Sequence, residues 1–91
     1  MLVYTTLKFM PYAQAKVKRL SNCIQLISYK TTVAEIVGGV LVVHGLHSTT
    51  TRRHISAFVR EYCGTDYQTA KKCYIDNIGY DIVLRKYVEI K

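Results

Sequence analysis

The chain has 91 residues, 49% of them hydrophobic, and its 13 Lys and Arg against six Asp and Glu give a formal net charge of +7. This length predicts one domain over residues 1–91 with a single modest core, and it excludes a further deep, enclosed active site. The apolar content excludes a disordered chain, and no apolar run approaches the roughly 20 residues that span a bilayer. The charge excludes an acidic nucleic-acid mimic and favours nucleic acid, an acidic protein surface or an anionic membrane as partner.

The first half of the chain predicts β-strands. Residues 15–20 alternate apolar and basic side chains, which is typical of a half-buried strand. Residues 23–37 hold two runs rich in β-branched residues, and these indicate either one long bent strand or two short ones. Gly38 and Gly39 lie between apolar runs and tolerate the positive φ of a tight turn, so we predict a hairpin with a returning strand at 40–45.

The hydrophobic period changes to that of a helix after this hairpin. Ser48 or one of the threonines that follow it can accept a hydrogen bond from a free backbone N–H and so begin a helix. Gly64 is the usual kind of C-terminal stop, and together these signals predict a helix over about residues 49–63. The apolar stripe expected to face the core consists of Ile55, Phe58, Val59 and Tyr62.

A second helix is expected over about residues 66–77. Thr65 and Gln68 have the spacing of a capping box at its start, and Asn77 is a typical residue at its end. The face that we expect it to turn to the core carries Tyr67, Ala70 and Tyr74.

The C-terminal residues 80–90 again alternate, which predicts an edge or packing strand and leaves a C-terminal helix open as the alternative. The order of elements is therefore strands, two helices and a strand. We predict an α+β fold in which a small antiparallel sheet packs on the pair of helices. The sheet would consist of the N-terminal strands, the Gly38-Gly39 hairpin and the C-terminal strand.

The cysteines and histidines indicate neither disulfides nor a metal site. Cys23, Cys63 and Cys73 are odd in number and lack the pattern of a secreted scaffold, so we expect reduced, buried thiols and a cytosolic location. Cys63 and Cys73 are too far apart for a zinc-binding pair, and His44 with His47 supplies only half a site. We therefore expect no metal and no cofactor.

Catalytic motifs are also missing from the sequence. It contains no nucleophile elbow and no phosphate-binding glycine loop, and none of its acidic residues adjoins a histidine. His44, His47 and His54 could form a general-base site or a ribonuclease-like pair with Arg52, but only their clustering supports this. We therefore predict no catalytic residue and a protein that is not an enzyme.

The start of the first helix is the most informative stretch. A helix N-terminus carries partial positive charge, so Arg52 and Arg53 are placed against the local dipole. Threonine hydroxyls, free N–H groups and guanidiniums together form a good receptor for a phosphate or carboxylate. At roughly 100° per residue, Arg53, Ala57 and Arg60 are expected on the solvent side. A plainer interpretation is that the threonines only cap the helix and the arginines only keep the surface soluble. The predicted partner-binding residues are Thr50, Thr51, Arg52, Arg53 and Arg60.

Two narrower modes of nucleic-acid binding have partial support. The two helices suggest a helix-turn-helix, but Thr65 follows Gly64 where that motif usually has an apolar residue. The eight tyrosines could stack on single-stranded bases, yet the glycine and aromatic signature of sheet-type RNA binders is absent. In a helix-turn-helix, the side chains facing base edges would be Gln68, Thr69 and Lys72.

Residues 27–62 resemble a group of short, uncharacterised proteins encoded by bacteriophages and mobile elements. The shared pattern is Ser-Tyr-x-Thr-x-Val-Ala, a glycine after a short strand, and Ser-x-Thr-Thr before a His-Ile helix, although the third threonine of this chain leaves the register ambiguous. The resemblance implies a phage-type accessory protein inside a bacterium and implies no activity. The matching positions are Ser28, Tyr29, Thr31, Val33, Ala34, Gly45, Ser48, Thr50, Thr51, His54 and Ile55.

Small phage accessory proteins often inhibit host machinery, including CRISPR–Cas and other defence systems, by stoichiometric binding. By this analogy we expect a non-enzymatic protein in the cytoplasm of a bacterial host that binds and inhibits or redirects a host protein or a protein–nucleic acid complex. The alternative is a basic accessory protein that binds nucleic acid directly. No membrane partner is expected, and a homodimer through a sheet edge is left open.

Overall fold

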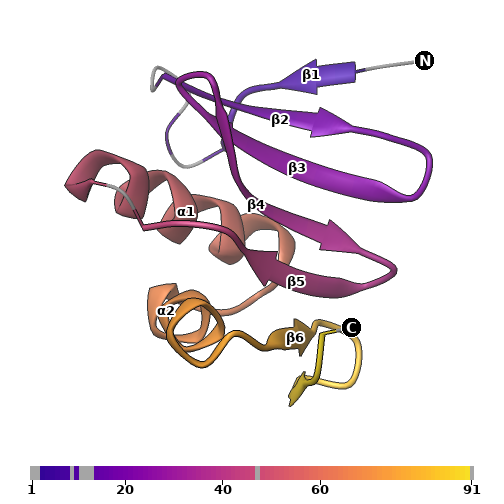
Figure 1. The fold of residues 1–91 in the computed structure, drawn as a ribbon. Helices are drawn as coiled ribbons and strands as arrows, with labels where there is room; N and C mark the ends of the chain where they lie inside the picture. Colours follow the sequence, from indigo (N-terminus) through magenta and orange to yellow (C-terminus); the bar gives the residue numbers. More distant parts are fainter. Residues whose placement is uncertain (1–2, 9, 11–13, 47, 91) are drawn as a thin grey trace.

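The computed structural model describes residues 3–8, 10, 14–46 and 48–90. They form a seven-stranded antiparallel sheet with two helices on one face, as Figure 1 shows. The predicted α+β architecture, a sheet packed on a pair of helices, is confirmed. Within the described part of the chain, no helix is long and apolar enough to cross a membrane.

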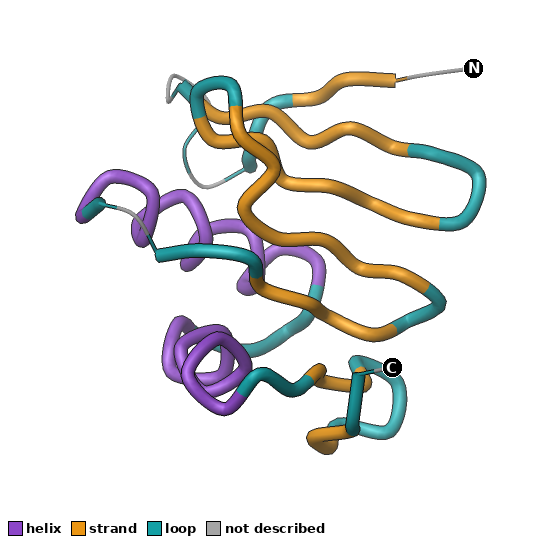
Figure 2. The backbone as a smooth tube through the Cα atoms, in the orientation of Figure 1, coloured by secondary structure: helices purple, strands orange, loops and turns teal. Residues whose placement is uncertain are grey.

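Strand order in the sheet follows chain order, and each strand pairs antiparallel with the next. Both helices are inserted between the fifth and sixth strands, and Figure 2 shows them beside the strands. The strands are β1 (Val3–Thr5), β2 (Ala15–Arg19), β3 (Cys23–Ser28), β4 (Thr31–Val37), β5 (Val40–Val43), β6 (Gly79–Asp81) and β7 (Lys86–Val88), and the helices are α1 (Thr49–Tyr62) and α2 (Tyr67–Asp76).

The segment over residues 23–37 forms two strands, which decides between the two expected arrangements. Tyr29, with a φ of 59°, begins the two-residue turn between β3 and β4. The pairing steps from Leu26 opposite Ala34 to Ile27 opposite Thr32, so Val33 has no partner across the ladder. This β-bulge turns the side chains of both Val33 and Ala34 into the core, where both are buried.

The hairpin at Gly38 and Gly39 is confirmed. Val37 pairs with Val40 across it, and the two glycines have φ values of 58° and 80°. Positive φ at both central residues matches the right-handed twist of the flanking strands, and it is a conformation that glycine adopts without strain.

Replacing both glycines with valine is expected to lower the free energy of unfolding by about 2–4 kcal/mol. A Cβ atom at either position would meet nothing within 4 Å, so the effect comes from backbone strain alone. Urea unfolding of the Gly38→Val, Gly39→Val variant measures it. The control is Gly38→Asn, Gly39→Asn, because asparagine tolerates positive φ and should retain most of the stability. Wild-type stability in the valine variant would contradict this account of the turn.

The C-terminal residues form a hairpin, so the predicted single strand over 80–90 is wrong in this detail. Asp81 Oδ1 accepts hydrogen bonds from the N–H groups of Val83 and Leu84 at 2.9 and 2.8 Å. Arg85 has a φ of 56°, and its N–H donates to the Asp81 carbonyl at 2.8 Å. The aspartate side chain thus builds a tight turn between β6 and β7 inside a run that alternates like one strand.

The helices begin and end close to the predicted residues. Ser48 caps α1 by accepting the Thr51 N–H at 3.1 Å, and Gly64 follows the helix with a φ of 65°. Asp66, not Thr65, caps α2, so the predicted capping box is wrong. Asp66 Oδ1 accepts the Thr69 N–H at 3.3 Å, and a carboxylate at the positive end of a helix is a strong cap. Asn77 ends α2 in the left-handed conformation, as predicted.

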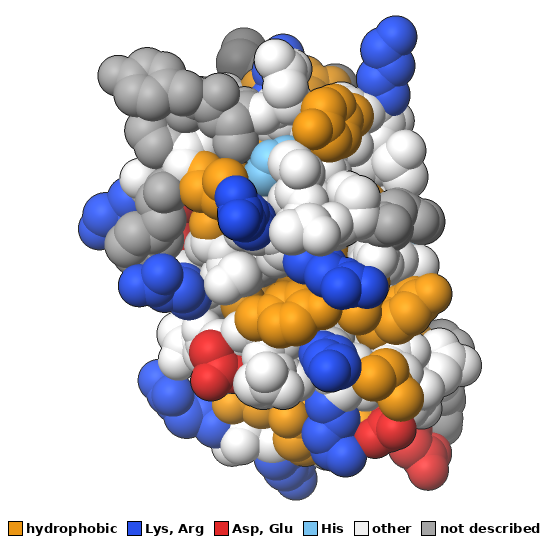
Figure 3. All heavy atoms as spheres, turned by 90° about the vertical axis from the view of Figure 1, so that its left-hand side faces the viewer, with side chains coloured by type: hydrophobic (Ala, Val, Ile, Leu, Met, Phe, Trp, Pro, Cys, Tyr) orange, Lys and Arg blue, Asp and Glu red, His pale blue; other side chains and the backbone are white. Residues whose placement is uncertain are grey.

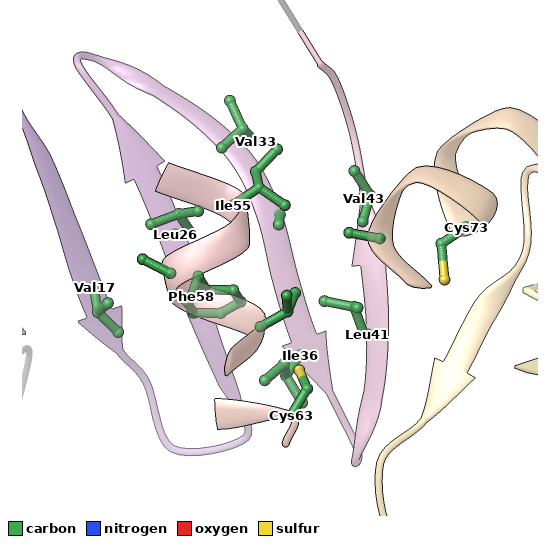
Figure 4. Packing of buried hydrophobic residues seen from close by; sticks show 14 of the residues in the cluster. Val17, Leu26, Val33, Ile36, Leu41, Val43, Ile55, Phe58, Cys63 and Cys73 are labelled. Carbon is green, nitrogen blue, oxygen red and sulfur yellow. The ribbon is translucent and has the colours of Figure 1, made fainter. Parts of the chain in front are cut away.

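The core lies between the sheet and the helices (Figure 4). Helix α1 packs on β3 and β4, and α2 packs on β5 and β6. Ile55, Phe58 and Val59 are buried as predicted, and Tyr62 is half-buried. Ala57, which we expected to face solvent, is buried, on the side of α1 where Glu61 accepts the Lys8 N–H.

The face of α2 that meets the core differs in part from the prediction. Ala70 is buried as expected, but Tyr74 is exposed. Thr69 and Cys73 are buried beside Ala70 instead, and Cys73 points toward Leu41 on β5 in Figure 4. The short polar or sulfur-containing side chains fit a helix that lies close to the sheet, whereas the large tyrosine ring does not.

Candidate functional site

Three arginines form one exposed stripe on α1. Arg52, Arg53 and Arg60 are all exposed, and we call them the arginine stripe. At roughly 100° per residue they fall within an arc of about 100°, opposite the buried Phe58 and His54. Arg52 and Arg60 are separated by about 12 Å along the helix axis. The stripe is therefore a narrow, elongated cationic surface.

The segment that carries Arg52 and Arg53 is poor in acidic residues. The first turn of α1 holds no acidic residue, and the chain has none between Glu35 and Glu61. Those two carboxylates are engaged elsewhere: Glu35 lies 3.0 Å from His44, and Glu61 accepts the backbone N–H of Lys8 at 2.6 Å. Figure 3 views the side on which α1 begins, and Lys and Arg side chains far outnumber Asp and Glu there.

The two threonines predicted to contact a partner lie in different environments. Thr50 is exposed, but Thr51 is only 4% exposed. The Thr51 hydroxyl lies 3.2 Å from Ser28 Oγ and 3.2 Å from Ser48 Oγ, so it is engaged inside the fold. We therefore limit the candidate contact set to Thr50 and the arginine stripe.

A polar network that is buried at Ser28, Thr51 and His54 fixes the start of α1 against the sheet. Ser28 Oγ, at the end of β3, lies 2.8 Å from His54 Nδ1, and both residues are buried, with exposed fractions of 3% and 1%. The ring of Tyr29 lies 5.9 Å from that of His54 and tilts over it. Burial lowers the pKa of His54 below its ordinary value of 6.5, which favours the neutral imidazole at neutral pH. We call Ser28, Ser48, Thr51 and His54 the His54 network.

The His54 network positions the helix and does not offer a reaction site. A serine hydroxyl beside an imidazole resembles a nucleophile and its base, but both side chains are buried too deeply for a substrate to reach them. The sequence analysis missed this network. One signal was present, because His54 falls on the same side of α1 as Ile55 and Phe58.

The other residues that were considered for metal binding, thiol chemistry or base contacts form no second site among the described residues. Cys63 and Cys73 are buried, and desolvation is the main cause that raises their pKa to about 12 and about 11, so both thiols are protonated at neutral pH. Cys23 is half-buried and free, and His47 lies outside the described residues. Thr69, proposed for base contacts in a helix-turn-helix, is buried. Among the described residues, no group of three or more His, Cys, Asp and Glu could hold a metal ion.

Comparison with known proteins gives one family match. Residues 4–77 match a family described as "Family of unknown function (DUF8033)", and this range includes the arginine stripe and the His54 network but not the β6–β7 hairpin. The searches of curated proteins and of solved structures give no match. Because the match covers most of its length, the chain belongs to this family of unknown function.

Proposed function

We propose that this protein is a non-enzymatic, phage-type accessory protein of the bacterial cytoplasm. The protein binds a host macromolecule through the arginine stripe, and this binding inhibits or redirects the macromolecule. The class of target that we propose is a bacterial defence component such as a CRISPR–Cas effector. The phage context comes from the resemblance of residues 27–62, and the binding surface comes from α1.

The observation that carries the proposal is the arginine stripe itself. Arg52 and Arg53 lie in the first turns of α1, where positive charge is unfavourable by a few tenths of a kcal/mol or more. A folding role would favour acidic residues there, and the first turn has none. Guanidinium groups bind carboxylates and phosphates in a bidentate manner, and Thr50 adds an exposed hydroxyl. These features favour an anionic partner surface.

The His54 network supports the same proposal. It links the first turns of α1 to the end of β3 through hydrogen bonds of 2.8 and 3.2 Å. The backbone that carries Arg52 and Arg53 is thereby fixed, since Thr51 and His54 flank these arginines on the buried side. A fixed backbone reduces the entropy lost when the arginines bind a partner.

The Arg52→Ala, Arg53→Ala, Arg60→Ala variant is expected to fold normally and to lose at least about tenfold in affinity, because it removes contacts without creating a cavity. The partner would first be identified by a pull-down from the bacterial host with mass spectrometry. Circular dichroism melts and titration of that partner then measure folding and affinity.

A charge-matched comparison tests whether the stripe acts as a site. The Arg52→Ala, Arg53→Ala variant removes the same charge as Lys16→Ala, Lys18→Ala, which lie at alternate positions of β2 away from the buried Val17. Only the arginine pair should weaken binding. Equal losses would show that net charge alone attracts the partner, and normal binding by a well-folded triple variant would reject the stripe as the interface.

Direct nucleic-acid binding is the second candidate, and the three exposed arginines of the stripe favour it. In that case binding to the nucleic acid alone should weaken steeply with salt, and the triple arginine variant should lower the salt slope by up to about three. A protein interface with an apolar centre should depend much less on salt.

A further inference from the structure

Exposed apolar side chains gather at the C-terminal end of the structure. Of the nine exposed large hydrophobic side chains among the described residues, six lie between residues 74 and 90. Val83 and Leu84 are adjacent in the chain, and their exposed fractions reach 79% and 63%. The other four are Tyr74, Ile75, Tyr87 and Ile90.

The turn that presents Val83 and Leu84 is a built structure. Both of their N–H groups donate to Asp81 Oδ1, and the Arg85 N–H donates to the Asp81 carbonyl. Ile82 N–H donates to the Gly39 carbonyl at 3.0 Å, which ties the hairpin to the β4–β5 turn. The two aliphatic side chains are therefore held in solvent by the backbone of a tight turn, and no core position is left for them. We call residues 82–86 the hairpin tip.

Two cationic residues lie beside the exposed aliphatic pair of the hairpin tip. Arg85 and Lys86 follow the two aliphatic residues directly, and both are exposed. On the neighbouring helix α2, Lys72 lies with its Nζ 5.4 Å from the centroid of the Tyr87 ring. Two nearby carboxylates are hydrogen-bonded, since Asp81 holds the turn and Asp76 lies 2.8 Å from Lys72. Glu89 is exposed beyond β7. The tip is thus an aliphatic protrusion with a cationic and aromatic base.

A second copy of the chain fits this surface poorly. Strand β7 is a sheet edge of only three residues, which is short for pairing with the edge of a second copy. Two chains that each carry a net charge of +7 would also repel one another. A convex tip with two aliphatic side chains is likewise too small for the apolar centre of a standard protein interface.

We propose that the hairpin tip is a peripheral docking site for an anionic membrane surface. Val83 and Leu84 enter the boundary between headgroups and acyl chains, and Arg85 and Lys86 contact the anionic headgroups. Tyr87 lies at the base of the tip, and tyrosine is enriched at membrane interfaces. This departs from the sequence-based expectation of no membrane partner. The tip also lies beyond the residues that match the family.

The chain contains no tryptophan, so one introduced tryptophan reports on its own surroundings. The Leu84→Trp variant is expected to show a blue shift of its fluorescence with vesicles of equimolar phosphatidylglycerol and phosphatidylcholine, and none with phosphatidylcholine alone. Tyr4→Trp, on the exposed and distant strand β1, is the control and should show no shift. If the Leu84→Trp variant sediments with the anionic vesicles but its fluorescence shows no blue shift, the tip remains in water and the proposal is wrong.

Vesicle sedimentation separates this site from the arginine stripe. The Val83→Ser, Leu84→Ser variant should bind the anionic vesicles at least about tenfold more weakly than the wild type. The triple arginine variant should keep the Leu84→Trp blue shift, so this proposal can fail or succeed independently of the proposed function. Vesicle binding would be assigned to α1 instead by either of two results. In the first, the serine variant sediments with vesicles as the wild type does; in the second, the three arginine substitutions abolish the blue shift of Leu84→Trp.

Discussion

Replacing His54 with alanine is expected to lower the free energy of unfolding by about 2–4 kcal/mol. The substitution leaves a cavity beneath the Tyr29 ring and removes the partner that lies 2.8 Å from Ser28 Oγ. Because Ser28 is buried, its hydroxyl would lose a hydrogen bond that water cannot replace and would keep only the contact with Thr51. Urea unfolding followed by circular dichroism measures the effect. The matched variant Ser28→Ala should lose only about 1 kcal/mol, because it removes the hydrogen bond without a large cavity.

The pH dependence of stability provides a second readout of the same histidine. Burial lowers the pKa of His54 below 6.5, so the unfolded chain binds the proton more readily than the folded one. The stabilisation is therefore fully present above pH 6.5 and is lost as the pH falls below it, through the folded-state pKa. In His54→Ala this part of the slope should disappear. A wild-type stability that does not fall just below pH 6.5, before carboxylates titrate near pH 4, would contradict a buried neutral imidazole.

Replacing Phe58 with alanine is expected to cost about 3–5 kcal/mol. Phe58 is fully buried at the centre of the interface between α1 and the sheet, and Figure 4 places its ring between α1 and the strands. A domain of this size is stable by about 5–14 kcal/mol, so the variant should be close to unfolding at physiological temperature. Thermal melts by circular dichroism measure the loss.

Two control variants make the Phe58 result specific. Phe58→Leu keeps most of the apolar volume and should lose far less stability. Ser56→Ala on the opposite side of α1 should change stability by less than about 0.5 kcal/mol. A loss of under about 1 kcal/mol in Phe58→Ala would mean that the site collapses around the smaller side chain and that the core is not closely packed there.

The fold was predictable where local chemistry and hydrophobic period agree. The positive φ of Gly38 and Gly39, the Ser48 cap and the Asn77 stop are all decided by a few neighbouring residues. The β6–β7 turn was not predictable from alternation, because the Asp81 carboxylate builds it through hydrogen bonds to its own following residues. A turn that is held by a side-chain carboxylate leaves the alternation of apolar and polar residues unchanged, so the alternation does not reveal it.

The candidate site divides in the same way. The exposure of Arg52 and Arg53 follows from the helical period, which places them away from the apolar stripe. The burial of Thr51 does not follow from it, since its partner Ser28 comes from a strand 23 residues earlier in the chain. Likewise Ala57 is buried on the side of α1 where Glu61 accepts the N–H of Lys8, a contact between residues 53 positions apart that the sequence of α1 does not reveal.

The strictly sequential order of strands has a consequence for how the chain reaches this structure. Neighbouring strands from β2 to β5 are joined by short connections, so this part of the sheet can form as successive hairpins with low contact order. The pairing of β5 with β6 must instead wait for both helices to be made. On the ribosome the first five strands therefore emerge before the layer that covers them, with Leu26 and Leu41 on an uncovered face. A nascent chain of this kind depends on rapid synthesis of α1, or on a chaperone, to avoid pairing with another chain.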